Sequence, residues 1–189
     1  MTPRQKRNGA DPFAAVREAT LAHRAKHGCG AYPYSNGALL GALAGAANAR
    51  RILELGTALG YSALWFAHGA PDAVVDSIER DDEHVRLARE HVTAHELDGH
   101  IIVHHGDFAD ILAGLDPGYD VAFFDGFTPS PPVLTELRRL LHSRAVLISA
   151  NLTHGGKEAE AYRAGLLKTK TWLTAFIGDQ GETAISIKL

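Results

Sequence analysis

The chain has 189 residues, a net charge of -3, 46% hydrophobic residues and 22% charged residues, as expected for one soluble globular domain with a full core. The only basic cluster lies in the first seven residues, so the sequence lacks the basic face that a large nucleic-acid interface requires. No apolar run approaches the ~20 residues of a membrane span. The composition therefore predicts neither a nucleic-acid partner nor a membrane partner.

Cys29 is the only cysteine, which excludes an internal disulfide and gives no sign of an oxidising compartment. It stands between two glycines without an evident base, which argues against a nucleophile. Residues 1–10 are polar and basic, and we interpret them as a disordered leader rather than a signal peptide. We expect a cytoplasmic protein in which residues 11–189 form a single domain.

Two helices are predicted before the first strand. The first opens at Asp11, the expected N-cap, and runs to about Lys26, and the second is capped by Ser35 and ends near Asn48. A glycine-flanked loop, residues 28–34, joins them. Because these helices lack a core of their own, we expect them to pack over the carboxyl edge of the sheet.

Strands and helices alternate from residue 51 onward. The expected strands are residues 51–55, 73–79, 101–105, 119–125 and 145–150, and the expected helices are residues 61–68, 81–95, 106–114, 131–141 and 156–166. Two further strands, residues 169–177 and 182–188, are joined by a tight turn. The pattern predicts an α/β fold with a doubly wound, mostly parallel seven-stranded sheet that ends in an antiparallel hairpin.

The first strand and its turn are the most informative segment. An apolar run ends in Glu54, Gly56 and Gly60 follow at once, and a second apolar run ends in Glu79, 25 positions after Glu54. Open parallel sheets hold nucleoside cofactors in this way, because glycines allow close backbone approach and the second acid accepts hydrogen bonds from ribose hydroxyls. The alternative for Glu79 is a solvated strand end.

The glycine spacing argues against a dinucleotide cofactor. A pyrophosphate fingerprint needs a third glycine, and Tyr61 stands in its place. Glu54 would also repel phosphates, whereas an acid beside the turn suits a cation such as the sulfonium of S-adenosylmethionine. A purely structural role for a buried Glu54 stays open.

Over about residues 30–189, the chain resembles the class I S-adenosylmethionine-dependent methyltransferases. Within that class it is most similar to the catechol and caffeoyl-coenzyme A O-methyltransferases. The motifs that carry the resemblance are Glu54-Leu55-Gly56-Thr57 with Gly60-Tyr61-Ser62, Ser77-Ile78-Glu79, Gly106-Asp107, Tyr119 to Asp125, and the upstream segment Ser35 to Leu40. The terminal hairpin also fits.

The resemblance implies how the cofactor is bound. Glu54 and Gly56 would line its methionine part, and Ser62 would lie near its carboxylate. Glu79 would take the ribose hydroxyls, and Asp107 and Phe108 would flank the adenine, with a helix N-cap as the alternative role of Asp107. The full set of expected cofactor contacts is Glu54, Gly56, Thr57, Gly60, Ser62, Glu79, Gly106, Asp107, Phe108 and Asp125.

The metal site of the family is incomplete here. Relatives bind one divalent cation through two aspartates and an asparagine. Asp125 and Asn151 match two of these ligands, but Ala150 replaces the second aspartate, and Thr128 replaces a lysine base. Because Mg²⁺ prefers hard oxygen ligands, usually including carboxylates, we expect that no metal is required, with a weak Asp125–Asn151 site as the alternative.

Without metal or lysine, another group must take the proton of the acceptor. Asp125 and His154 are the candidate bases, since histidine titrates near neutrality. The alternative role of His154 is a surface loop histidine. Four aromatic residues, Tyr32, Tyr34, Trp65 and Phe127, are candidates for the walls of the acceptor pocket or for core packing.

These patterns favour an S-adenosylmethionine-dependent O-methyltransferase that modifies a hydroxyl of a small molecule. Two alternatives stay open. One is a cofactor-binding protein that has lost catalysis, and the other is a nucleic-acid or protein methyltransferase, for which the sequence offers only scattered arginines. The resemblance also suggests a homodimer.

Overall fold

The computed structural model describes residues 11–178 and 182–189. Its seven strands form one sheet in the order β3-β2-β1-β4-β5-β7-β6. The first five are parallel, and β7 is antiparallel to both of its neighbours. The strands are β1 (Arg51–Leu55), β2 (Val74–Glu79), β3 (Ile101–His105), β4 (Tyr119–Phe124), β5 (Leu141–Ser149), β6 (Trp172–Ile177) and β7 (Thr183–Lys188). The predicted seven-stranded, mostly parallel sheet with its C-terminal hairpin is confirmed.

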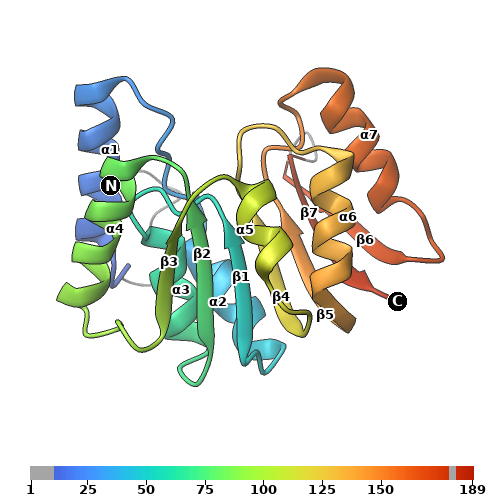
Figure 1. Ribbon diagram of the computed structural model, residues 1–189, viewed down its shortest axis with the longest axis horizontal. Coiled ribbons are helices and arrows are strands. Elements are labelled where there is room, and N and C mark those ends of the chain that lie inside the picture. The colour runs from blue at the N-terminus through green and yellow to red at the C-terminus, as the bar shows by residue number, and fades with distance from the viewer. Residues whose placement is uncertain (1–10, 179–181) are drawn as a thin grey trace.

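Seven helices of the described part cover the sheet. Figure 1 shows α5, α6 and α7 on one face and α2 and α3 on the other, with α1 beside α4. The helices are α1 (Ala14–His27), α2 (Gly37–Ala46), α3 (Tyr61–Gly69), α4 (Asp82–Ala94), α5 (Phe108–Gly114), α6 (Pro131–Leu140) and α7 (Gly156–Leu166). None of them is long and apolar enough to cross a membrane.

Side chains of the central strands alternate between two hydrophobic cores. In β1, Ile52 joins the core that contains residues of α2, α3 and α4, whereas Leu53 joins the core that contains residues of α5, α6 and α7. Val121 and Ala122 divide in the same way in β4. Both faces are therefore buried, which explains why these strands are apolar throughout rather than alternating with polar residues.

Strand β5 begins four residues earlier than predicted. Leu141 pairs with Tyr119, and the register then shifts before Val121 pairs with Val146. Arg144 adopts a positive φ of 73° within this irregular stretch. The sequence pattern missed it because residues 142–144 are polar and exposed, so no apolar alternation marks them as a strand.

Both predicted helix caps are wrong by one or two residues. Asp11 accepts a hydrogen bond from the Phe13 backbone, but α1 starts only at Ala14. At α2 the capping side chain is Asn36, which accepts from the backbone of Leu39, rather than Ser35. Either residue type can fill the position, so the local sequence does not decide between them.

The N-terminal helices do not lie over the carboxyl edge as a pair. Helix α2 packs against α3 on one face of the sheet, where glycines let the two backbones approach closely. The loop 28–36 is the part that reaches the edge, since Gly30 lies against the Phe127 ring and Tyr34 packs on Phe123 at 5.2 Å between ring centroids.

The chain order of the strands reverses between β1 and β4. β2 and β3 lie on one side of β1, and β4 and β5 lie on the other. In open α/β sheets, ligands bind at the carboxyl ends of the strands where the order reverses in this way. Glu54 is the penultimate residue of β1 and Asp125 directly follows β4, so both predicted site residues lie at this switch point.

Candidate cofactor and active site

Glu54 is completely buried and belongs to a short chain of hydroxyl groups. The Ser77 hydroxyl donates a hydrogen bond to Glu54 Oε2 at 2.5 Å, and Thr57 Oγ1 lies 2.6 Å from Ser77 Oγ. Glu54 Oε1 has no hydrogen-bond partner among the described residues. Burial raises the Glu54 pKa to about 7 against the opposing effects of Ser62 and Ser77, and the charge of Glu79 adds to the rise.

The orphaned Glu54 oxygen is the feature that best fits a cationic ligand. A buried carboxylate oxygen that lacks a hydrogen-bond partner is costly, and a sulfonium or ammonium group beside Oε1 would lower that cost. Ser62, in the first turn of α3, is also buried. Glu54, Ser62 and Thr57 therefore lie close together, and their role in binding the methionine part of a cofactor stays a prediction.

Both predicted glycines of the turn between β1 and α3 adopt a left-handed backbone conformation. Gly56 has a φ of +104°, and a Cβ there would lie 3.1 Å from the Asp125 carbonyl oxygen. Gly60 has a φ of +94° and precedes the first residue of α3. Side chains are disfavoured in this conformation. Gly56 lets the turn approach the end of β4, whereas a Cβ at Gly60 would lie 3.7 Å from Ala88 of α4.

Glu79 lies at the end of β2 and organises the neighbouring backbone. Its Oε2 accepts from Ala58 N at 2.9 Å, and its Oε1 accepts from the backbone of Arg80 and Asp81 at 2.9 and 3.0 Å. It is therefore not a solvated strand end. It ties the glycine turn to β2, and a carboxylate has one further acceptor site for a ribose hydroxyl.

The segment after β3 brings Gly106, Asp107 and Phe108 to the same edge. Asp107 is exposed and occupies the N-cap position of α5, but its side chain makes no capping hydrogen bond. The Phe108 ring packs on Phe124 at 6.2 Å, and a Cβ at Gly126 would lie 2.8 Å from it. Asp107 is thus available to a ligand, and Phe108 forms a wall beside the end of β4.

Asp125 retains some exposed surface, but other groups crowd its carboxyl. Asn151 Nδ2 donates to Asp125 Oδ1 at 2.9 Å. Burial raises the Asp125 pKa to about 8, and the charge of Glu54 adds to the rise, while the Asn151 hydrogen bond opposes it. At neutral pH, Asp125 is consequently a carboxyl that can take up or release a proton.

The donor set at Asp125 and Asn151 does not fit a magnesium site. Asn151 Nδ2 also lies 3.3 Å from the Asp125 carbonyl oxygen and 3.2 Å from that of Gly126. Backbone carbonyls only accept hydrogen bonds, so the amide nitrogen and not the oxygen must face them. The one remaining carboxylate would have to bind the cation without the amide oxygen, and Ala150 supplies no side-chain ligand.

His154 lies exposed in the loop after β5, where its backbone N–H donates to the Asn151 carbonyl at 3.0 Å. Among the aromatic candidates, Trp65 packs on Phe13 at 5.4 Å and against Gly37, and so belongs to the helix interface. Tyr32 is stacked under the Arg24 guanidinium at 3.7 Å.

Tyr34 and Phe127 are the two aromatic candidates at the carboxyl edge. Phe127 is 72% exposed. Burial raises the Tyr34 pKa against a hydrogen bond with Thr183, and the charge of Asp125 adds to the rise. Tyr34 is therefore close enough to Asp125 for the charge of that carboxylate to affect the Tyr34 pKa.

Sequence reasoning missed the role of Ser77, which links Glu54 to Thr57. The residue stands in the quoted motif before Glu79, but a buried serine in a strand has no local signature. Thr183 was missed for the same reason, since it meets Tyr34 only when β7 inserts beside β5.

Comparison with known proteins agrees with this geometry. Residues 53–149 match a family model described as a methyltransferase domain. The chain belongs to this family. A protein of Mycobacterium sp. (strain KMS), assigned as an O-methyltransferase, is 33% identical over 152 residues, which cover 78% of this chain and 67% of that protein.

Two further similar proteins are both O-methyltransferases. Catechol O-methyltransferase of Mycobacterium tuberculosis is 33% identical over 123 residues, covering 64% of this chain and 56% of that protein. The O-methyltransferase TomG of Streptomyces achromogenes, solved in complex with S-adenosylmethionine, has a TM-score of 0.81 and 25% identity, covering 100% of this chain and 99% of that one. The predicted membership of the class I S-adenosylmethionine-dependent O-methyltransferases is confirmed.

Proposed function

We propose that this methyltransferase transfers the methyl group of S-adenosylmethionine to a hydroxyl of a small molecule without a metal ion, with Asp125 as the general base. The observation that carries the proposal is the pairing of Asp125 with the amide nitrogen of Asn151. With its amide nitrogen toward Asp125, Asn151 does not present its side-chain oxygen as a second ligand beside that carboxylate. It leaves a carboxyl whose pKa, raised to about 8, is matched to proton transfer near neutral pH.

Glu54 and Glu79 hold the cofactor in this proposal. The Glu54 carboxylate lies beside the methionine part, where a positive charge of the cofactor favours its ionised form. Glu79 fixes the glycine turn and accepts a ribose hydroxyl. Ser62, Thr57, Asp107 and Phe108 complete the expected contacts. S-Adenosylmethionine itself supplies a sulfonium whose methyl group is already activated, so the protein contributes mainly alignment.

Methyl transfer needs only one protein group to accept a proton, and we assign that role to Asp125. A lone pair of the acceptor oxygen attacks the methyl carbon, and the carbon–sulfur bond breaks with its electron pair going to sulfur, which becomes a neutral thioether. The proton of the acceptor hydroxyl passes to the Asp125 carboxylate. Because Oδ1 already accepts from Asn151, Oδ2 is the oxygen assigned to receive this proton.

A small aromatic hydroxyl compound fits the surroundings of Asp125. Tyr34 and the exposed Phe127 provide aromatic surface at the edge, and the net charge of -3 does not favour a nucleic acid. The M. tuberculosis relative is named for catechol, so catechols are the first acceptors to test. The suggested homodimer stays a prediction.

The test is a methyl-transfer assay with a panel of catechols and other phenols, with product formation followed with excess chelator and again with excess Mg²⁺. We expect turnover that is unchanged by chelator. Asp125→Asn should lower kcat by about 10²–10⁴-fold while S-adenosylhomocysteine still binds.

The matched control is Asp110→Asn, at an exposed aspartate of α5, which should leave kcat unchanged. Turnover that requires Mg²⁺ would overturn the metal-free proposal. Cofactor binding without turnover on any acceptor would favour a protein that has lost catalysis.

A further inference from the structure

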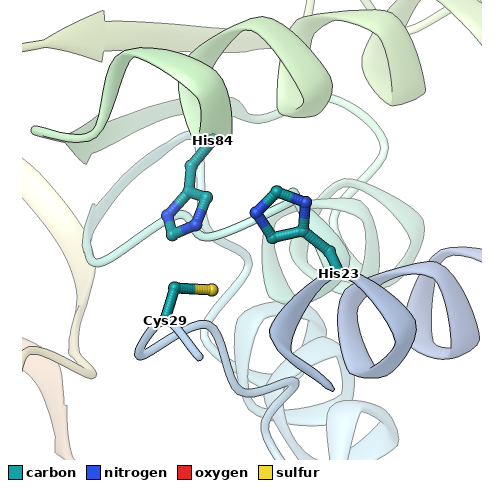
Figure 2. A group of neighbouring side chains, drawn as sticks. All are labelled: His23, Cys29 and His84. Atoms are coloured by element: carbon teal, nitrogen blue, oxygen red, sulfur yellow. The ribbon is translucent and has the colours of Figure 1, made fainter. Parts of the chain in front are cut away.

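A second group of reactive side chains lies beside the cofactor edge and has no role in the proposed methyl transfer. His23 comes from α1, Cys29 from the loop that follows it, and His84 from the first turn of α4. One ligand atom of each lies within 4.8 Å of the other two. Figure 2 shows the two imidazole rings and the thiol pointing toward a common centre.

The orientation of His84 suits a metal ligand. His84 is only 7% exposed, and its Nδ1 lies 3.9 Å from Glu79 Oε1. The other ring nitrogen, Nε2, is therefore the one on the side of Cys29 and His23 (Figure 2). A carboxylate next to the second nitrogen of a liganding histidine is the usual outer partner in zinc sites, because it fixes the ring and raises its basicity.

Ring contacts hold the His23 side chain beside His84. Its ring stacks on His27 with 4.4 Å between centroids and meets the His84 ring at 5.2 Å. These contacts keep the His23 imidazole on the side of the cluster where Cys29 and His84 lie.

The donor set selects a borderline or soft metal rather than magnesium. Two imidazoles and one thiolate suit Zn²⁺, whose sites combine nitrogen and sulfur ligands at about 2.0–2.3 Å. Ligand atoms of a tetrahedral site with these bonds are roughly 3.4–3.7 Å apart. The present separations, up to 4.8 Å, require the ligand atoms to close by only about 1 Å, which side-chain rotation can supply.

The place of the cluster gives such a metal a structural effect. Cys29 is the second residue of the loop 28–36, whose Gly30 and Tyr34 lie against Phe127 and Phe123 at the carboxyl edge. Cys29 and His84 are distant in sequence, and a metal between them would fasten this loop to α4. The loop would then be held beside Asp125, on the side expected to receive the acceptor.

We propose that His23, Cys29 and His84 bind one Zn²⁺ ion, with a water molecule as the fourth ligand, and that this ion fastens the loop 28–36 over the carboxyl edge. The site is separate from the Asp125–Asn151 position and does not depend on the proposed reaction. Its test therefore needs neither S-adenosylmethionine nor an acceptor.

The first experiment titrates the metal-free full-length protein with Zn²⁺ and with Co²⁺. We expect one Zn²⁺ per chain with at least micromolar affinity, and a Co²⁺ complex that shows a sulfur-to-cobalt charge-transfer band. Cys29→Ser should remove that band and weaken Zn²⁺ binding at least 30-fold, and His23→Gln should weaken it at least tenfold. Excess Mg²⁺ should not compete.

His27→Gln is the matched control, because His27 is an exposed histidine that stacks on His23 but is not one of the three ligands. It should change Zn²⁺ affinity by less than threefold. The protein has eleven histidines, so Zn²⁺ binding that is equally strong in wild type and Cys29→Ser would show binding elsewhere and would overturn the proposal. Absence of Zn²⁺ binding would do the same.

A second measurement keeps the proposal testable if a variant folds poorly. In the wild-type protein, Zn²⁺ should slow proteolytic cleavage within residues 28–36, since the loop would be tied at Cys29. Cleavage at an unchanged rate with saturating Zn²⁺ would contradict the fastening role. Melting curves recorded without metal would show whether Cys29→Ser alters the fold itself.

Discussion

Asp125 is the residue whose environment decides most about the chemistry. Its backbone closes the end of β4 through a hydrogen bond from Asp125 N to the Leu55 carbonyl at 2.9 Å. Its carboxyl then lies between the buried Glu54 and the amide of Asn151. Ionising one of two neighbouring carboxyl groups makes ionisation of the other less favourable. The pair therefore keeps one proton until a cation binds beside it or a base takes the proton up.

The pH dependence of stability follows from this raised pKa. The folded-state pKa of Asp125, about 8, lies above its ordinary value of 3.8, so the folded state binds the proton more tightly than the unfolded state. The contribution is fully present below pH 3.8 and is lost as pH rises through about 8. We expect Asp125→Asn to become more stable relative to wild type from pH 5 to pH 8, by at most about 1.4 kcal/mol per pH unit.

Urea unfolding of the cofactor-free proteins at pH 5, 6.5 and 8 measures this difference. Asp110→Asn, on the exposed side of α5, provides the comparison that should show no such trend. A constant stability difference between Asp125→Asn and wild type across this range would mean that Asp125 is ionised throughout, contrary to our interpretation.

At the scale of elements, the contact between α2 and α3 depends on glycine. A Cβ at Gly69 would lie 2.0 Å from the Gly41 carbonyl oxygen, and a Cβ at Gly45 would lie 2.7 Å from the Gly69 carbonyl oxygen. These neighbours are backbone atoms, which cannot rotate away. The closely packed pair places α3, and with it the glycine turn at its start, on the sheet.

We expect Gly69→Ala to destabilise the protein by about 1–3 kcal/mol, because the two helices must separate to admit the methyl group. Gly114→Ala, at the end of α5 where a Cβ meets nothing within 4 Å, should instead be neutral or stabilising by up to about 1 kcal/mol. Denaturant unfolding of both variants measures this contrast. Equal stability of the two variants would show that α2 and α3 adjust freely.

For the whole molecule, one edge of the sheet gathers residues that are far apart in the chain. Glu54 and Glu79 lie at the ends of β1 and β2, and three more polar residues follow β3, β4 and β5, namely Asp107, Asp125 and Asn151. A ligand that contacts several of these ends ties together both halves of the fold. Binding should therefore be visible in global stability.

We expect S-adenosylhomocysteine at about 100 times its Kd to stabilise the folded state by about 2.7 kcal/mol, which raises the Tm by roughly 5–11 °C for a domain of this size. Glu79→Ala should weaken binding at least tenfold, because it removes the expected ribose acceptor and releases the backbone of Ala58. At the same ligand concentration its Tm should rise by several degrees less.

Thermal melts with and without ligand measure both effects, and calorimetric titration gives the Kd. Glu83→Ala serves as the control, since it removes an exposed acid of α4 that pairs with Arg86. Unchanged affinity in Glu79→Ala would place the ribose elsewhere on the edge.

The sequence by itself determined the order of elements, the glycine turn and the acids at the strand ends. These features are local, because apolar runs and glycines act within a few residues. Strand β5 shows the limit, since its first four residues carry no apolar alternation and are recognised only through pairing with β4.

Only the tertiary structure decided which groups face one another. In the folded chain the Asn151 nitrogen faces Asp125, Ser77 lies beside Glu54, and Cys29 lies near His23 and His84. His23 lies only six residues before Cys29 in the chain, but His84 comes from the separate helix α4. Proximity of this kind depends on how helices pack on a sheet, and no local pattern encodes it.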